Sequence, residues 1–368
     1  GLVGSEMCIR DSLNNIYGVD IDLQAVETTK LSLLLKVLEG ESDETISRQM
    51  TLFQKRALPD LDGNIKCGNS LIGPEYYESV QINFLDEEEF YRINVFDWRE
   101  NFPKIIKSGG FDVVIGNPPY IRIQALKEWA PIEVNVYKEK YQSAKKGNYD
   151  IYVIFVEKSL NLLNSEGLLG LILPHKFFKA QYGQSLRTMI KKGQYLKQLV
   201  YFGDQQIFKQ ASTYTCLIFL AKSGLESFSY ADVKNLEQWI LFKKSSKSII
   251  PSSQLNNESW FFCEEVERSL CEKLQKFPDF LGDLTEKIGQ GIRTSANDVY
   301  VLDLVNKSYS FDLLCAYSKS LKKEVYLEKE SVSFFLKGEE IKSYHISPSG
   351  QVVILPYELT DQGITLIN

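Results

Sequence analysis

Short apolar runs alternate with helix-like segments over roughly the first 225 residues of the chain. In residues 23–38 the apolar side chains recur at helical spacing, whereas residues 168–174 form the continuous apolar run of a central strand. The predicted strands are 15–22, 64–71, 111–116, 168–174, 195–202 and 212–221, and the predicted helices are 23–38, 149–167 and 184–193. This alternation predicts an α/β sheet with helices on both faces.

The pattern changes after residue 225. Residues 243–259 are polar and rich in turn-forming residues, and residues 263–277 have the spacing of a short amphipathic helix. We therefore predict a linker and helical connector over 226–280. Short strands and turns follow, and they predict a separate α+β domain over 281–368.

Composition excludes several classes of protein. No apolar run reaches the ~18 residues of a membrane-spanning helix. The six cysteines form no Cys-x-x-Cys pair, and the only two histidines are His175 and His345. These counts predict no metal site, and they fit reduced thiols in a cytoplasmic protein.

Charge is unevenly distributed along the chain. The net charge is −6, yet residues 137–250 hold 17 Lys and Arg against 8 Asp and Glu. A positive block in an acidic protein is what a local phosphate-binding face needs. The alternative is a merely solvated, lysine-rich surface.

One segment, "FDVVIGNPPYIRI" at residues 111–123, ends a predicted strand in an unusual way. The strand is followed by Asn117, Pro118, Pro119 and Tyr120. Proline fixes φ and drives the preceding residue into an extended conformation, so the tetrad is a rigid strand exit. The segment alone does not show whether it does more than that.

Polar side chains follow three of the predicted strands. Asp20, Asn69 and Asn117 each lie at a carboxyl end. Ligands of open α/β sheets bind beyond these ends, so we expect the three residues to share a binding site.

The ordered motifs "YGVDID", "CGNSL", "FDVVIGNPPYI", "GLLGLILPHKFF" and "QIFKQASTYTCLIFL" resemble the adenine-specific DNA methyltransferases of restriction–modification systems. The segments "IGQGIRTSANDVYVL" and "FLKGEEIKSY" resemble the target-recognition domain that follows the methylase in one type of these enzymes. The resemblance covers nearly all of the chain from Leu13 to Asn368. The tetrad alone is less specific, because RNA-guanine and protein-glutamine methyltransferases share it.

The resemblance implies a Rossmann-like class I methyltransferase domain over 13–225 and a target-recognition domain over 281–368. It implies S-adenosyl-L-methionine as cofactor, double-stranded DNA as partner, and a nuclease domain or subunit in the same defence system. Two alternatives stay open: methylation of RNA or of a protein glutamine, and a non-catalytic DNA-recognition subunit.

The tetrad suits methylation of an amine. The lone pair of the adenine N6 amine is delocalised into the ring, and two fixed acceptors would turn it toward a methyl donor. The side-chain oxygen of Asn117 and the carbonyl of Pro118 can be these acceptors. A base that has left the duplex also needs a stacking partner. Tyr120 is the expected partner, and the resemblance adds Phe208 as a second aromatic wall.

The cofactor residues are expected at the first two strand ends. A carboxylate at Asp20 can accept hydrogen bonds from both ribose hydroxyls, whereas Asp22 suits the N-terminus of the following helix. By resemblance, Asn69 contacts the cofactor adenine.

The expected DNA contacts lie in two places. Lysines and tyrosines alternate in "YKEKYQSAKKGNYD", which we interpret as a basic, aromatic loop on the DNA backbone. Its lysines are Lys138, Lys140, Lys145 and Lys146. In the recognition domain Arg293 is a candidate reader of guanine. We expect His175 to serve packing or a turn.

Residues 1–12 look like the translation of a sequencing adapter, and we exclude them from the fold. The family carries a glycine-rich cofactor loop before "YGVDID", and no such loop lies between Leu13 and that motif. We therefore expect a truncated chain that binds cofactor more weakly than a longer parent.

Overall fold

The computed structural model describes residues 14–38, 60–79, 87–145, 147–208 and 213–262, and further on 270, 273–274, 276–280, 282–286, 289, 291–292, 294, 296–305, 312–355, 357–360 and 363–366. The chain divides into unit 1, residues 1–270, and unit 2, residues 271–368. The adapter-like residues 1–12 and most of the helix predicted over 263–277 lie outside the described residues.

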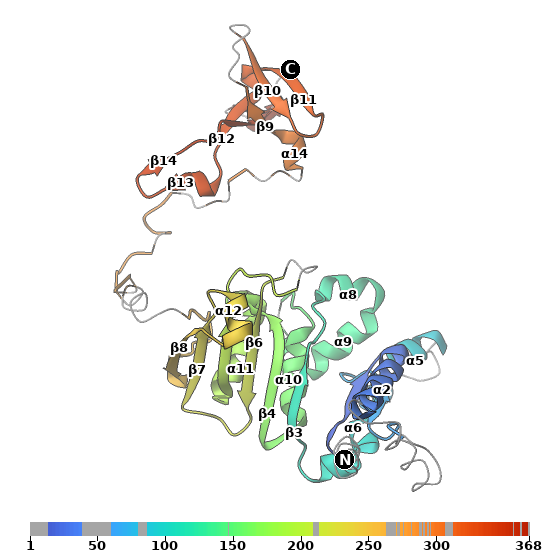
Figure 1. The fold of residues 1–368 in the computed structure, drawn as a ribbon. Helices are drawn as coiled ribbons and strands as arrows, with labels where there is room; N and C mark the ends of the chain where they lie inside the picture. Colours follow the sequence, from blue (N-terminus) through green and yellow to red (C-terminus); the bar gives the residue numbers. More distant parts are fainter. Residues whose placement is uncertain are drawn as a thin grey trace. The chain divides into compact units, whose positions relative to one another are not determined.

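A six-stranded mixed sheet is the framework of unit 1 (Figure 1). Its strands in spatial order are β3 (Phe111–Gly116), β4 (Leu163–Pro174), β6 (Thr215–Ala221), β5 (Leu196–Tyr201), β7 (Ser227–Asp232) and β8 (Ser246–Pro251). β3 is parallel to β4, and β6 is antiparallel to both of its neighbours. β1 (Gly18–Asp20) and β2 (Ile65–Cys67) pair in parallel as a separate sheet.

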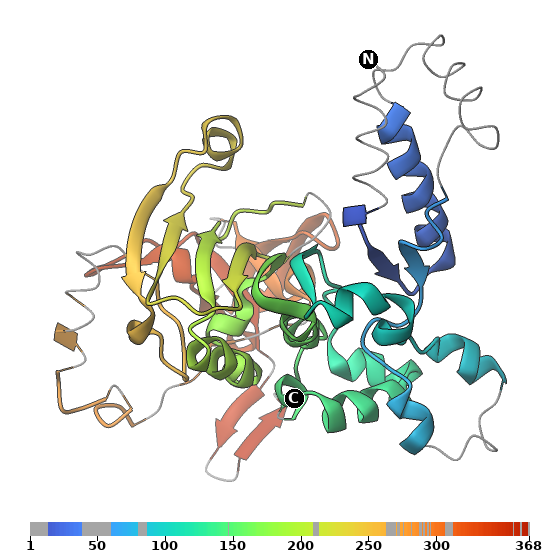
Figure 2. The same cartoon turned by 90° about the horizontal axis from the view of Figure 1, so that it is seen from below.

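Helices connect these strands. The longer ones are α2 (Leu23–Leu38), α5 (Glu87–Ile93), α8 (Ile123–Trp129), α9 (Pro131–Lys140), α10 (Tyr152–Leu162), α11 (Gln184–Lys192) and α12 (Leu236–Phe242), and the shorter ones are α4 (Glu75–Ser79), α6 (Trp98–Asn101) and α7 (Pro103–Lys107). α2 packs beside the β1–β2 pair, away from β5, β7 and β8 (Figure 2). The α/β architecture predicted from the sequence is confirmed.

The core lies on both faces of the sheet, because alternate side chains of a strand point to opposite faces. On β6, Ile218 and Leu220 are fully buried in the main core with residues of α10 and α11. Leu217 packs in a second cluster, with Val200 and with Trp239 of α12. Helices therefore cover both faces, as the sequence predicted.

The sheet continues past residue 225, where the sequence predicted a linker. β7 pairs in parallel with β5, and β8 pairs antiparallel with β7. The linker prediction is wrong for residues 227–251. β8 is an edge strand in which only Ile250 is buried, so it lacks the apolar alternation that reveals a strand.

The boundary between α10 and β4 also differs from the prediction. The helix ends at Leu162, and β4 already begins at Leu163. Gly167 therefore lies within a strand and does not close a helix. A Cβ at Gly167 would lie 2.9 Å from the carbonyl oxygen of Phe111, so the glycine permits the close approach of β3 and β4.

Unit 2 is built mainly of strands. Its five-stranded sheet consists of β11 (Lys323–Glu328), β10 (Leu313–Ser318), β9 (Val301–Leu304), β15 (Gln351–Ile354) and β12 (Val332–Phe335), in that order. Its described residues also form two antiparallel pairs. These are β13 (Ile341–Lys342) with β14 (His345–Ile346), and β16 (Tyr357–Thr360) with β17 (Gly363–Leu366). Unit 2 also contains the short helix α14 (Asn297–Tyr300). Leu302, Ala316 and Val352 form its buried core.

None of the helices in the described parts of the chain combines the length and the apolar composition that crossing a membrane requires.

Candidate functional site

The tetrad Asn117–Tyr120 leaves the carboxyl end of β3 as a fixed segment. Pro118 is buried, whereas Asn117 is exposed. Beyond the tetrad, the carbonyl of Ile121 accepts a hydrogen bond of 2.9 Å from the backbone N–H of Ile151. The sheet holds the tetrad on one side, and the start of α10 holds it on the other.

Tyr120 is tied to the residue that begins the tetrad. Its hydroxyl lies 2.9 Å from Oδ1 of Asn117 and 3.1 Å from the carbonyl oxygen of Ile172, and it donates to these acceptors. The half-buried ring meets Tyr152 edge-on, with 6.3 Å between the centroids. Burial raises the pKa of Tyr120 to about 12, so the hydroxyl keeps its proton at neutral pH.

The predicted convergence of strand ends is present. Asp20, Asn69, Asn117 and Pro118 line one cavity of about 900 Å³, which we call the strand-end cavity. Its walls come from β1, from β3 and from the loop after β2. Parallel strand ends thus bring together residues almost a hundred positions apart.

The charged groups of the strand-end cavity are nearly balanced. Arg92 and Glu133 form an ion pair of 2.7 Å in its wall. The remaining charges are those of Asp20 and Lys158. Burial lowers the pKa of Lys158 to about 8.

Asp22 has the helix-capping role that the sequence assigned to it, and the ribose contact of Asp20 stays a prediction. Oδ1 of Asp22 accepts from the backbone N–H of Gln24 at 2.8 Å, in the first turn of α2, so it caps that helix. Oδ1 of Asp20 accepts from the backbone N–H of Asp22 at 2.8 Å. The carboxylate of Asp20 lines the cavity and is exposed, so its other oxygen can accept from a ligand.

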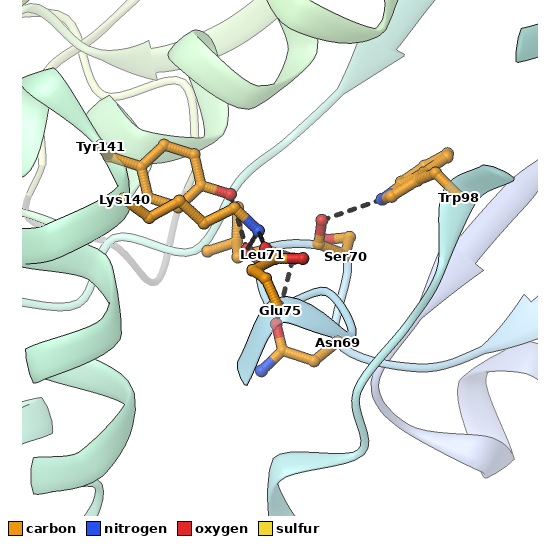
Figure 3. A network of polar contacts seen from close by, with 7 residues as sticks. All are labelled: Asn69, Ser70, Leu71, Glu75, Trp98, Lys140 and Tyr141. Carbon is orange, nitrogen blue, oxygen red and sulfur yellow. Dashed lines mark hydrogen bonds and ion pairs between the residues drawn. The ribbon is translucent and has the colours of Figure 1, made fainter. Parts of the chain in front are cut away.

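Asn69 is buried in a tight turn after β2. Its Oδ1 accepts from the backbone N–H of Leu71 at 3.1 Å, and its side chain also hydrogen-bonds the hydroxyl of Tyr137, which leaves one amide N–H to donate. Figure 3 shows Lys140 and Tyr141 converging on the carbonyl of Leu71 in the same turn. On the other side, the indole N–H of Trp98 donates to the carbonyl of Ser70 at 3.0 Å.

The segment predicted as a basic loop is mostly helix and core. Residues 131–140 form α9, and Tyr137, Tyr141 and Tyr149 are buried. Lys140 forms an ion pair with Glu75 and donates to the carbonyl of Leu71 at 3.1 Å. Its ammonium is therefore committed inside unit 1, and the prediction of Lys140 as part of a free phosphate-binding loop is wrong.

The other predicted DNA contacts have different outcomes. Lys138 and Lys145 are exposed, which leaves their contact with DNA a prediction. Lys146 and Arg293 lie outside the described residues.

A second cavity is lined by Tyr120, which does not line the strand-end cavity. It measures about 680 Å³ and is rich in aromatic side chains, so we call it the aromatic cavity. Its ring-bearing walls include Tyr120, His175, Tyr201, Tyr214, Tyr230 and Trp260. Both cavities fall within the size range of small-molecule sites.

His175 packs as the sequence predicted. Its ring lies 4.9 Å from that of Tyr201 and is stacked on Tyr214 at 6.3 Å. Burial lowers the pKa of His175 below its ordinary value, so the ring is neutral near neutral pH.

Phe208, the predicted second aromatic wall, is 38% exposed and does not line either cavity. Tyr214, six residues further on, lines the aromatic cavity together with Tyr120. In this segment the ring that lines the aromatic cavity is therefore Tyr214, and not the predicted Phe208.

Sequence reasoning missed the cationic side chains of the aromatic cavity. Arg122, Lys176 and Lys179 line it, next to a single carboxylate, Asp150. A signal was present, because Arg122 lies two residues after the tetrad, Lys176 lies within the "LPHKFF" motif and Lys179 follows that motif directly.

The described part of the chain contains no group of three or more His, Cys, Asp or Glu side chains that could hold a metal ion.

Comparison with known proteins identifies relatives for most of the chain. A sequence model described as Eco57I restriction-modification methylase matches residues 14–208. The chain is 33% identical over 333 residues to the type II restriction enzyme and methyltransferase RM.Eco57I of Escherichia coli, which covers 89% of the chain and 30% of that protein. It is 24% identical over 311 residues to the type II methyltransferase M.BstVI of Geobacillus stearothermophilus, covering 78% of the chain and 50% of the relative.

A further relative is the adenine-specific methyltransferase PglX of Streptomyces coelicolor, 27% identical over 185 residues, which cover 48% of the chain and 14% of that protein. The chain thus spans at most half the length of these three curated relatives.

Proposed function

Because the chain belongs to the Eco57I restriction-modification methylase family, we propose that it methylates the N6 amine of adenine in duplex DNA, with S-adenosyl-L-methionine as methyl donor. The observation that carries this proposal is the position of the tetrad between two cavities. Asn117 and Pro118 line the strand-end cavity, and Tyr120 lines the aromatic cavity. A donor on one side and a base on the other would meet at the tetrad.

The strand-end cavity fits the cofactor in charge and in hydrogen bonding. S-adenosyl-L-methionine supplies an electrophilic methyl group on a sulfonium and carries a net positive charge. Asp20 offers a carboxylate oxygen to the ribose hydroxyls, and Asn69 can donate its amide N–H to a ring nitrogen. The Arg92–Glu133 pair is internally neutral, so it does not repel a cation.

On the aromatic side the chain's own residues orient the amine. Tyr120 offers its ring to an extruded adenine in place of the stacking lost on leaving the duplex. Oδ1 of Asn117 and the carbonyl of Pro118 accept the two N6 protons and turn the nitrogen lone pair toward the methyl group. After transfer the amine is positively charged, and its proton leaves to solvent.

The proposal also covers the role of unit 2. We assign the choice of DNA sequence to unit 2, by resemblance of its segments to target-recognition domains. The relative from Escherichia coli is named as both restriction enzyme and methyltransferase, so we extend the proposal to a defence system that includes a nuclease.

The methylation proposal is tested by replacing Asn117. Asn117→Ala removes one of the two acceptors, and we expect N6-methyladenine formation to fall at least about a hundredfold while DNA affinity stays within a factor of two. The measurement is methyl incorporation from labelled cofactor into unmethylated DNA, with mass spectrometry of the digested nucleosides. Asn135→Ala, an exposed asparagine of α9 away from both cavities, is the control.

Methyl groups on RNA guanine or on protein glutamine would overturn the assignment of the substrate. DNA binding without any methyl transfer by the unaltered protein would favour a recognition subunit.

The role of unit 2 has its own test. Residues 281–368 are exchanged for those of a relative, and methylated sites are mapped by sequencing. We expect the methylated motif to change while the modified atom remains N6 of adenine. An unchanged motif would place recognition elsewhere.

A further inference from the structure

The aromatic cavity carries an excess of positive charge at its surface. Arg122, Lys176 and Lys179 line it and are exposed. Among the described residues none of the three forms an ion pair. The single carboxylate, Asp150, accepts a hydrogen bond from the hydroxyl of Tyr182 at 3.2 Å. The charge of this cavity therefore suits an anion.

Lys179 is held beside an aromatic ring. Its ammonium lies 4.8 Å from the ring centroid of Phe261, which is 67% exposed and also lines the cavity. A cation on an aromatic face is attracted by the ring quadrupole. The contact restricts the lysine while leaving the ammonium accessible to a ligand.

A buried arginine joins the segment that carries Lys176 and Lys179 to the segment that carries Phe261. Arg187 is 1% exposed, and its guanidinium donates to the carbonyls of Ala180 at 2.9 Å and Asn257 at 3.2 Å. It donates also to the carbonyls of Phe177 and Glu258. Residues 175–180 and 257–262 are thus joined through one side chain. Burying a charge is unfavourable unless it is fully hydrogen-bonded, which makes this junction rigid.

The walls inside this rim are rings, and the rim itself is cationic. Stacking rings select a base, and cations select a phosphate. A nucleotide within a strand presents both, because it carries one phosphate on each side of its sugar.

We propose that Arg122, Lys176 and Lys179 form a phosphate-binding rim that holds the backbone on both sides of the nucleotide extruded into the aromatic cavity. The proposal rests on the proposed function for the position of the base. In this proposal the rim, and not the basic segment around Lys140, contacts the phosphates next to the reacting base. The rim fixes the backbone of the extruded nucleotide, so it acts on any base that reaches the cavity.

The test uses minimal ligands that need no recognition sequence. The full chain is titrated at low salt with 2′-deoxyadenosine and with 2′-deoxyadenosine 3′,5′-bisphosphate, and binding is measured by calorimetry. We expect the bisphosphate to bind about tenfold or more tightly than the nucleoside. In the double variant K176Q/K179Q this preference should largely disappear, while nucleoside affinity stays the same.

The matched control is K191Q/K192Q, which removes two lysines of α11 that do not line the cavity. It lowers the net charge equally, so it should keep the full preference for the bisphosphate. Circular dichroism of both variants checks that they are folded. An equal loss in both pairs would mean a general charge effect and would overturn the rim, as would a preference that survives K176Q/K179Q or a bisphosphate that does not bind.

Changing the base separates this inference from the proposed function. If the thymidine and deoxycytidine bisphosphates bind as tightly as the adenine compound, with the same dependence on the lysines, the rim stands and the adenine assignment fails. If deoxyadenosine binds selectively and the phosphates add nothing, the rim fails and the adenine assignment stands.

Discussion

The two cavities on either side of the tetrad differ in charge and in lining. Two carboxylates and two cations line the strand-end cavity, and one pair of these is an ion pair. Three cations and one carboxylate line the aromatic cavity. The strand-end cavity is therefore balanced in charge and the aromatic cavity is net positive, although Pro119 and Tyr120, which line one cavity each, are adjacent in the chain. The contrast teaches that local charge, and not the net charge of −6, indicates the partner.

Among the substitutions that test the contrast between the two cavities, the largest effect is expected at Tyr120, which lines the aromatic cavity. Tyr120→Ala removes a stacking surface worth about 1–3 kcal/mol, so kcat/KM for DNA should fall about 5- to 150-fold. Tyr120→Phe keeps the ring and should lose much less. Methyl incorporation at varied DNA concentration measures both, and a comparable loss of cofactor affinity in Tyr120→Ala would break the division between the cavities.

A smaller effect is expected at Asp20, on the cofactor side. Asp20→Asn keeps an oxygen for the backbone N–H of Asp22 but loses the charge, and hydrogen bonds to charged groups are about 1 kcal/mol stronger than neutral ones. We expect cofactor affinity to fall about fivefold, with DNA affinity unchanged. Calorimetry with cofactor and with DNA measures this. Asp22→Asn, which keeps the helix cap, should leave both affinities unaltered.

The turn that carries Asn69 offers a matched pair of tyrosines. The hydroxyl of Tyr141 donates to the carbonyl of Leu71 at 2.6 Å, whereas the buried hydroxyl of Tyr149 has no hydrogen-bond partner among the described residues. Tyr141→Phe should lower the free energy of unfolding by about 1 kcal/mol, and Tyr149→Phe should leave it unchanged or raise it. Urea denaturation compares them. Equal losses would mean that the network in Figure 3 contributes nothing specific.

The smallest effect concerns pH and Lys158. Its pKa is about 8 in the folded chain and near 10.5 in the unfolded chain, so between these values the unfolded chain binds the additional proton. The free energy of unfolding should therefore rise with pH in this window, by at most about 1 kcal/mol from pH 8 to 9. Thermal unfolding at both pH values measures the rise, and Lys158→Met should flatten it. A variant that keeps the full rise would assign it to another group.

Sequence patterns were sufficient for the parts of unit 1 that depend on local periodicity. The strand before Asn117 and the meeting of Asp20, Asn69 and Asn117 followed from apolar runs and from the geometry of strand ends. The strand could be predicted from its own few residues, and the meeting of the three side chains from the general rule that parallel strands end at the same edge of a sheet.

The misses depend on tertiary contacts. Lys140 has the sequence surroundings of a phosphate-binding lysine, and only the fold brings Glu75 and the carbonyl of Leu71 to it. In the same way, Phe208 and Tyr214 belong to one segment, and the path of the chain decides which ring turns into the cavity. The edge strand β8 lacks apolar alternation because neither of its faces is packed against the core, apart from Ile250.

The hydroxyl of Tyr120 has one proton and two acceptors within reach, Oδ1 of Asn117 and the carbonyl of Ile172. When an incoming amine occupies Oδ1, the hydroxyl can turn to the carbonyl without any movement of the ring. The substrate then replaces an internal donor, and no polar group of the protein loses its partner. In the proposed reaction, admission of the amine is therefore an exchange of donors that reverses when the product leaves.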